Sequence, residues 1–450
     1  SSKPPHKTNN INMIGKYYTT LGFYEPSVFH LHTLGDGKIN EMNKWSDKQK
    51  STFLHEYIHF LQDISTVQGL QNIYIGGEYL RFVTQEVFAN KNIPVRTPIL
   101  PRIPGQNVGA NWMVKIHTMG NLSIVQRAIS KRIDNTKSVT DENTGNVIQI
   151  PVIKVLCQKN ATETIEIDFG TVQIMEGMAK QIQTLVYPTA TSNSPYNPYY
   201  IAKDVADMVM PQISRKPRVL VALYYYALQS SNPGNAFVRY LEEKVNQGYD
   251  YNTLTKDIVY NDLRNATVNN VVMGNTSFSA AFKELGKSAL DVFREYTSGI
   301  YFFRNLDVWF NHIINNGQTF ALNNQSLFDD IIGGGDIVNN DAFLWLIDTF
   351  GTPLITNAVH DFGFINPKNV IITKDEITHV YAMMQIKKVF LSKGYFTCPL
   401  RKYCQKQPCG IRKQSVDVRC LKAPWERMRR WNRCKFNTWW YFKGFKNVIL

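Results

Sequence analysis

Long apolar runs are missing from this chain of 450 residues. A transmembrane helix needs about 18 or more consecutive apolar residues, and the most apolar run, Val219 to Leu228, is much shorter. That run is typical of a buried helix. The residues from Ser1 to Asn10 are polar and lack the apolar core of a signal peptide. We therefore expect a cytoplasmic protein with no transmembrane segment.

Cysteine is scarce and unevenly placed. Of the six cysteines, Cys157 stands alone, and the rest are Cys398, Cys404, Cys409, Cys420 and Cys434. An odd number in this C-terminal segment argues against a simple disulfide framework. The first four of the group lie close enough in sequence to form a structural zinc site. The CxxC pair that makes such sites recognisable is missing, so thiols in a packed tail are the alternative.

Acidic residues are nearly missing from the same segment. Residues 398–450 hold 14 Lys and Arg against two acids, Asp417 and Glu426, so their net charge is +12. The whole chain carries +14, which leaves +2 for all other residues. Aromatic residues are interleaved with the basic ones: Trp425, Trp431, Trp439, Trp440, Tyr441, Phe442 and Phe445. This mixture suits nucleic acid or another anionic partner, such as a membrane surface, or a protein-docking segment.

The remaining composition is that of a folded globular protein, with 44% hydrophobic and 19% charged residues. Residue patterns predict an α+β, helix-rich fold without internal repeats or coiled-coil heptads. We expect a catalytic region over residues 1–200 with a strand and loop insertion at about 90–170, a mainly helical region over 201–392 and a basic tail over 393–450. The expected helices are 46–69, 72–89, 172–185, several within 202–310, and 376–391; the expected strands lie near 27–34 and at 147–156, 162–169 and 370–372.

One motif carries chemistry: residues 55–59 read His-Glu-Tyr-Ile-His, an HExxH pattern. Ser46 and Gln49 have the spacing of a capping box, and apolar residues at helical period follow them. On a helix, His55 and His59 lie one turn apart on the same face, where two imidazoles can hold one metal ion. Glu56 lies beside them, where it can accept a proton from water. An amphipathic helix that carries these residues by chance is the alternative.

The stretch from Thr52 to Leu61 resembles the active-site helix of zincin metallopeptidases, with uncharged neighbours and a hydrophobic residue two positions after the second His. The resemblance implies a zinc cofactor and a third protein ligand. The metzincin branch would need Gly and His where this chain has Gln62 and Ser65, so the gluzincins are the closer group. Glu176, in a segment similar to their Glu-Gly-x-Ala pattern, is the favoured ligand. Glu78, at the spacing of the aminopeptidase N branch, is the other candidate.

The predicted function is that of a zinc-dependent metallopeptidase, an endopeptidase in which metal-activated water is deprotonated by Glu56. A regulated toxin or defence effector is one role that fits. His312, His360 or a tyrosine is expected to stabilise the oxyanion, and Asp63 is a weak candidate to orient a ligand. The alternative function is a nucleic-acid- or protein-binding module with a non-catalytic HExxH site.

Overall fold

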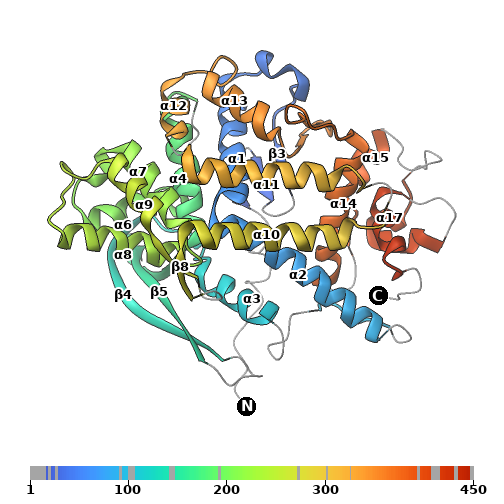
Figure 1. Cartoon of the computed structure of the whole chain (residues 1–450), viewed down its shortest axis with the longest axis horizontal. Helices are drawn as coiled ribbons and strands as arrows, with labels where there is room; N and C mark the ends of the chain where they lie inside the picture. Colours follow the sequence, from blue (N-terminus) through green and yellow to red (C-terminus); the bar gives the residue numbers. More distant parts are fainter. Residues whose placement is uncertain are drawn as a thin grey trace.

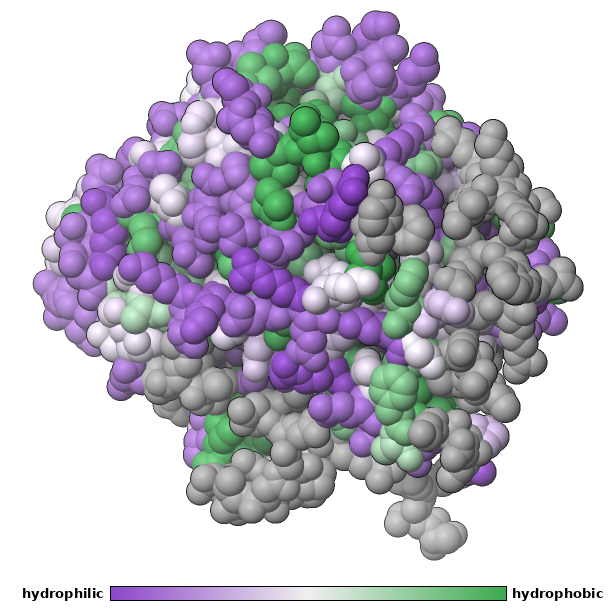
Figure 2. Space-filling model, turned by 45° about the vertical axis from the view of Figure 1, so that its right-hand side comes forward, coloured by the Kyte–Doolittle hydropathy of each residue, from purple (hydrophilic) through white to green (hydrophobic). Residues whose placement is uncertain are grey.

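The computed structural model describes residues 17–18, 22–25, 29–90, 94–99, 107–140, 147–190, 194–270, 274–300, 303–324, 326–392, 396–406, 416–429 and 434–445. Its helices are packed around one large apolar core, to which the five-stranded sheet contributes Leu31, Leu354 and Ile355, and two smaller sheets accompany them (Figure 1). This confirms the helix-rich α+β prediction. In the described parts, no helix combines the length and the apolar character that crossing a bilayer requires. The surface is mostly hydrophilic on the face seen in Figure 2, with smaller apolar areas.

The largest sheet joins the two ends of the chain. Its strand order is β1 (Tyr17–Tyr18), β2 (Gly22–Glu25), β3 (His30–Thr33), β9 (Leu354–Asn357) and β10 (Phe362–Gly363). All neighbours are antiparallel except β3 and β9, which are parallel and pair Leu31 with Ile355. The strand expected near residues 27–34 is therefore present as β3. The expected strand at 370–372 is wrong, because that segment is an irregular connection to the next helix.

Two long helices follow the first strands. After the short 3-10 helix η2 (Ile39–Lys44), α1 (Asp47–Ser65) begins at Ser46 with the predicted capping box, and α2 (Val67–Ala89) begins at Thr66. Gly69 was expected to end the first helix, but it lies in the first turn of α2. The helix breaks earlier because the Thr66 hydroxyl caps α2 by accepting a hydrogen bond from the Gly69 amide, 3.0 Å away. Gly69 is needed there because a Cβ would lie 2.3 Å from the Gln62 carbonyl oxygen.

A three-stranded antiparallel sheet precedes the helix that carries Glu176. It consists of β4 (Arg127–Thr140), β5 (Val147–Gln158) and β6 (Thr164–Phe169), and β4 and β5 form the long hairpin in Figure 1. The strands at 147–156 and 162–169 are confirmed, and β6 leads through Gly170 into α4 (Thr171–Val186). The segment before them was predicted as part of a strand and loop insertion; it contains the helix α3 (Asn107–Thr118), which was not predicted, and the long strand β4. The polar residues of β4 hid it, since this strand is paired on one side only, with β5.

The middle of the chain is helical, as predicted. Figure 1 shows α10 and α11 running alongside each other across the molecule. A two-stranded hairpin, β7 (Thr267–Asn270) and β8 (Gly274–Ser277), interrupts the helices. The helices are α5 (Tyr196–Tyr199), α6 (Ile201–Val209), α7 (Pro217–Ala227), α8 (Pro233–Asn246), α9 (Lys256–Asn265), α10 (Phe278–Thr297), α11 (Leu306–Asn323), α12 (Leu327–Gly333) and α13 (Asp341–Phe350), with the 3-10 helix η3 (Ile213–Arg215).

The basic tail folds onto the rest of the molecule. It follows α14 (Lys374–Leu391) and consists of α15 (Arg401–Lys406), α16 (Arg419–Lys422), η5 (Pro424–Arg429) and α17 (Lys435–Phe442), which packs against α14. Trp440 is fully buried and stacks on Phe390 of α14 with ring centroids 5.3 Å apart. The tail is therefore part of the apolar core. The division of the chain into three regions stays a prediction.

Candidate metal centre

The HExxH motif lies in the middle of a helix that is buried on every side. His55, Glu56 and His59 of α1 are each 0% exposed. The imidazole rings of His55 and His59 lie on the same helix face. Their centroids are 4.9 Å apart and their planes are nearly perpendicular. Imidazoles and a carboxylate are costly to bury without partners, so a helix of this composition requires compensating groups from the surrounding elements.

Glu176 of α4 provides that compensation. Its Oε2 lies 3.0 Å from His55 Nε2 and 3.4 Å from His59 Nε2, and the side chain is 1% exposed. Ligand atoms of His55, His59 and Glu176 all lie within 4.8 Å of one another, and no other such group exists among the residues that the structure describes. Ligands about 2.0–2.1 Å from a tetrahedral zinc are roughly 3.3 Å apart, so these separations fit the donor set of a zinc site.

Gln62 links the two helices of the site. Its Oε1 lies 2.8 Å from His59 Nδ1, and its Nε2 donates to the Met175 carbonyl oxygen at 3.1 Å. Asp63, the candidate for orienting a ligand, is also buried, but its carboxylate accepts a hydrogen bond from Tyr24 at 2.9 Å. The hydrogen bond to His59 is therefore made by Gln62. From the sequence, this residue had no role except to exclude the metzincin pattern, which has glycine at that position.

Burial and mutual charge interactions shift the pKa values of His55, His59 and Glu176 in different directions. Burial opposes charge on each group, but the negative charge of Glu176 raises the pKa of His59 to about 9. Burial lowers the pKa of His55, and its bond to Glu176 offsets only part of that effect. The charge of His59 and the bonds from both imidazoles hold the pKa of Glu176 at about 2, against the effect of burial. Glu176 is therefore an anion at neutral pH, as a metal ligand must be.

Further polar side chains surround the three ligands. Tyr199 of α5 is 5% exposed, and its ring centroid lies 5.9 Å from that of His55. Burial and the nearby charges of Glu176 and Glu56 raise the pKa of Tyr199, so its hydroxyl stays protonated and able to donate. Lys180 is buried one turn after Glu176, and its charge contributes to the low pKa of His55. A tyrosine was expected near the site, but the sequence could not indicate which, and Lys180 was missed.

Other predicted residues lie apart from this group. Glu78 of α2 binds Arg81 at 3.0 Å. His312 of α11 has its Nε2 2.8 Å from the Thr349 carbonyl oxygen. His360 follows β9 in a turn with φ of 59° and packs against Tyr403. Each has local partners of its own, so the structure brings none of these three residues to the His55, His59 and Glu176 group.

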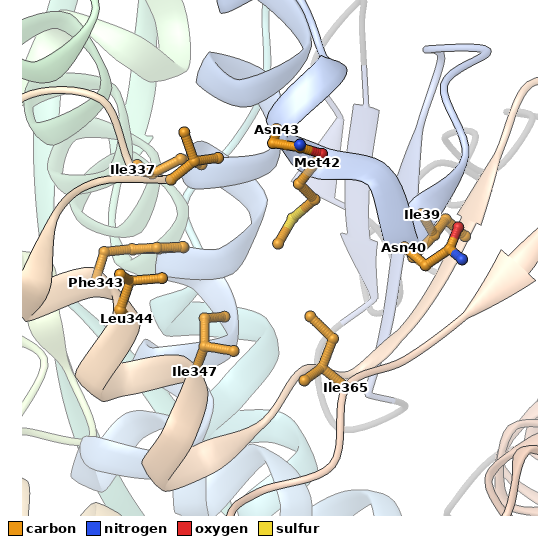
Figure 3. A pocket seen from close by; sticks show the side chains of 10 residues that line it. Ile39, Asn40, Met42, Asn43, Ile337, Phe343, Leu344, Ile347 and Ile365 are labelled. Atoms are coloured by element: carbon orange, nitrogen blue, oxygen red, sulfur yellow. The ribbon is translucent and has the colours of Figure 1, made fainter.

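The centre is closed in this conformation, since no ligand residue exceeds 1% exposure. A pocket of about 280 Å³ opens elsewhere, between η2 and α13 (Figure 3). Its walls are mainly apolar, and none of the residues of the metal centre lines it: Ile39, Asn40, Met42, Asn43, Ile337, Val338, Phe343, Leu344, Ile347 and Ile365.

The tail does not form a second metal centre within the described residues. No disulfide and no group of three convergent ligands is formed by the described tail cysteines, Cys398, Cys404, Cys420 and Cys434. Cys409 lies outside the described residues. Arg427 donates to Cys420 Sγ at 2.6 Å.

The tail aromatics are mostly buried. Trp425, Trp439, Trp440 and Phe445 are 0–5% exposed, so these rings are not available to stack on bases; Trp431 lies outside the described residues. Phe442 is exposed, so the nucleic-acid partner expected for residues 398–450 stays a prediction that depends on this ring and on the basic side chains.

Comparisons with known proteins found no match: no family model, no curated protein and no solved structure resembles this chain.

Proposed function

We propose that this chain is a zinc-dependent metallopeptidase with a zincin-like core, in which His55, His59 and Glu176 hold the metal. The observation that carries the proposal is the meeting of Glu176 with both imidazoles, although 121 residues separate it from His55. A helix that carried HExxH by chance would not require a buried carboxylate at the point where a third ligand belongs.

A zinc ion held by these residues would supply Lewis acidity, which polarises a carbonyl group and lowers the pKa of water toward neutrality. Glu56 then acts as the general base and passes the proton to the leaving amine. Glu56 follows His55 directly on α1 and is 0% exposed, so it lies beside the ligands. Tyr199, still protonated at neutral pH, is the donor that we assign to the developing oxyanion.

Glu56→Gln tests this proposal, because glutamine keeps the shape of the side chain and removes the base. We expect wild-type protein to contain one zinc per chain by elemental analysis and to cleave unfolded proteins or a quenched fluorescent peptide library. Glu56→Gln should keep the zinc and lose about 10²–10⁴-fold in cleavage rate. Equal cleavage by both proteins would show that Glu56 is not the base.

The complete burial of the site favours a second function, in which the metal is structural and the chain is a binding module. A structural zinc closes its coordination with protein groups and needs no base. In that case wild-type protein would bind zinc tightly and cleave no peptide in the library. Glu56→Gln would be as stable as wild type. Peptide cleavage requires, in contrast, that the elements over the site open.

A further inference from the structure

Gln62 occupies a connecting position between the two ligand-bearing helices. It lies on α1, one turn from His59, and it is 1% exposed. Its amide contacts His59 on one side and, on the other, the backbone of Met175, the residue before Glu176. One side chain therefore touches both halves of the proposed metal centre without supplying a ligand.

The direction of these two hydrogen bonds follows from chemistry. The Met175 carbonyl oxygen can only accept, so the NH₂ end of Gln62 must face it, at 3.1 Å. The carbonyl end of Gln62 then faces His59 Nδ1, at 2.8 Å, and Nδ1 must carry the proton. A neutral imidazole has one proton, so Nε2 keeps its lone pair. Nε2 is the atom that faces Glu176.

We infer that Gln62 is a positioning residue that fixes both the ring orientation and the tautomer of His59 for metal binding, an inference that rests on the proposed zinc site. Metal-binding histidines generally need such a partner on the second nitrogen, and its loss costs about 10–100-fold in metal affinity. Because Gln62 also holds the Met175 backbone, it sets the distance between His59 and Glu176. His55 contrasts with His59, since its Nδ1 is buried and has no hydrogen-bond partner among the described residues.

Gln62→Met tests the inference, because methionine has a similar length and makes neither bond. Gln183→Met is the matched control: Gln183 of α4 donates to the Ser51 carbonyl oxygen of α1 at 3.1 Å, so it ties the same two helices without touching His59. Zinc affinity is measured by competition with a chromophoric chelator at fixed pH. We expect Gln62→Met to bind zinc about 10–100-fold more weakly than wild type and Gln183→Met to bind it within about twofold.

A second measurement does not depend on zinc. In metal-free protein with ¹⁵N-labelled histidine, at alkaline pH where imidazoles are neutral, His59 should be protonated at Nδ1 in wild type and in Gln183→Met, but not uniquely so in Gln62→Met. Unchanged zinc affinity in Gln62→Met, an equal loss in Gln183→Met, or an Nε2-protonated His59 in wild type would overturn the inference. A wild-type protein that binds no zinc would refute the proposed function instead, and the tautomer measurement would still decide the role of Gln62.

Discussion

Replacing Glu176 with glutamine should abolish most of the zinc response, whereas the same change at Glu78 should not. Both glutamates were candidates for the third ligand, and both are buried. Glu176 lies 3.0 and 3.4 Å from the two imidazole nitrogens, while Glu78 is bound to Arg81. The pair of variants therefore separates loss of a ligand from loss of a buried carboxylate.

The size of the effect can be estimated from ligand number. Protein zinc sites with four ligands bind with roughly 10–16 kcal/mol, so one ligand contributes about 3–4 kcal/mol, or about 10²–10³-fold in Kd. At free zinc of about 1,000 times the wild-type Kd, zinc stabilises wild type by about 4 kcal/mol and a variant with a 1,000-fold weaker Kd by about 0.4 kcal/mol. For a chain of 450 residues, an unfolding entropy of about 0.9 kcal/mol per kelvin converts these into Tm shifts of about 4 °C and 0.5 °C.

Thermal unfolding with and without zinc, followed by calorimetry, measures these shifts on one sample of each protein. Chelator competition gives Kd independently. A Glu176→Gln protein that zinc stabilises as much as wild type would refute the assignment of the third ligand. If Glu78→Gln lost the response instead, the arrangement of α2 and α4 in the structure would be wrong.

Three further changes test other parts of the structure. Tyr199→Phe should lower peptide cleavage by about 10–10³-fold while zinc content stays at the wild-type value, because it removes an oxyanion donor and no ligand. Glu25→Gln should cost about 1–3 kcal/mol of unfolding free energy at pH 7, because it removes the acceptor of Lys388. The charge of Lys388 and the bonds from Lys388 and His30 lower the pKa of Glu25 well below 4.5 despite burial. Its stabilisation is therefore complete above pH 4.5 and is lost progressively below it, so the difference between the two unfolding curves should begin to shrink below pH 4.5 and still be present at pH 3. Trp440→Ala should cost about 3–5 kcal/mol in denaturant unfolding, because it empties the stack on Phe390.

Each of these expectations has a result that contradicts it. Unchanged cleavage in Tyr199→Phe would move the oxyanion donor to another group, such as Lys180. A constant difference between Glu25→Gln and wild type from pH 7 to pH 3 would mean that the pKa of Glu25 is not lowered in the folded state. A Trp440→Ala protein with wild-type stability would show that the tail is an appendage and not part of the core.

The site was more predictable from the sequence than the elements around it. His55, Glu56 and His59 follow from one helical turn, and Glu176 was indicated by the resemblance of its segment to the Glu-Gly-x-Ala pattern of gluzincins. Local signals were enough because capping by Ser46 and the β6–α4 junction are local structures. Gly177 faces Tyr224 and Ala202, so it accommodates α7 and α6, not α1.

The missed features depend on long-range packing. Gln62 and Tyr199 are polar residues without a motif, and only the approach of α4 and α5 to α1 gives them a role. The expectation of exposed aromatic residues in the tail also failed because it depends on long-range packing. The tail's tryptophans among basic residues suggested an exposed binding surface, but α17 buries Trp439 and Trp440 and packs against α14. Composition cannot distinguish a stacking platform from one side of a core, because both require the same rings.

The burial of the candidate metal centre restricts which elements can open it. Separating α1 from α4 would break the bonds that Gln62 and Gln183 make across that interface, and it would dismantle the ligand set. The short α5 supplies no ligand to that set, yet its Tyr199 packs against His55. It is only four residues long, and its Asn197 amide donates to the Asn121 and Ser123 carbonyl oxygens at 3.0 and 2.9 Å. Such bonds can be exchanged for bonds to water at small net cost, whereas the apolar contacts of α1 cannot. Under the proposed peptidase function, a peptide is therefore expected to reach the centre past α5, and the donor assigned to the oxyanion would move with the element that admits the substrate.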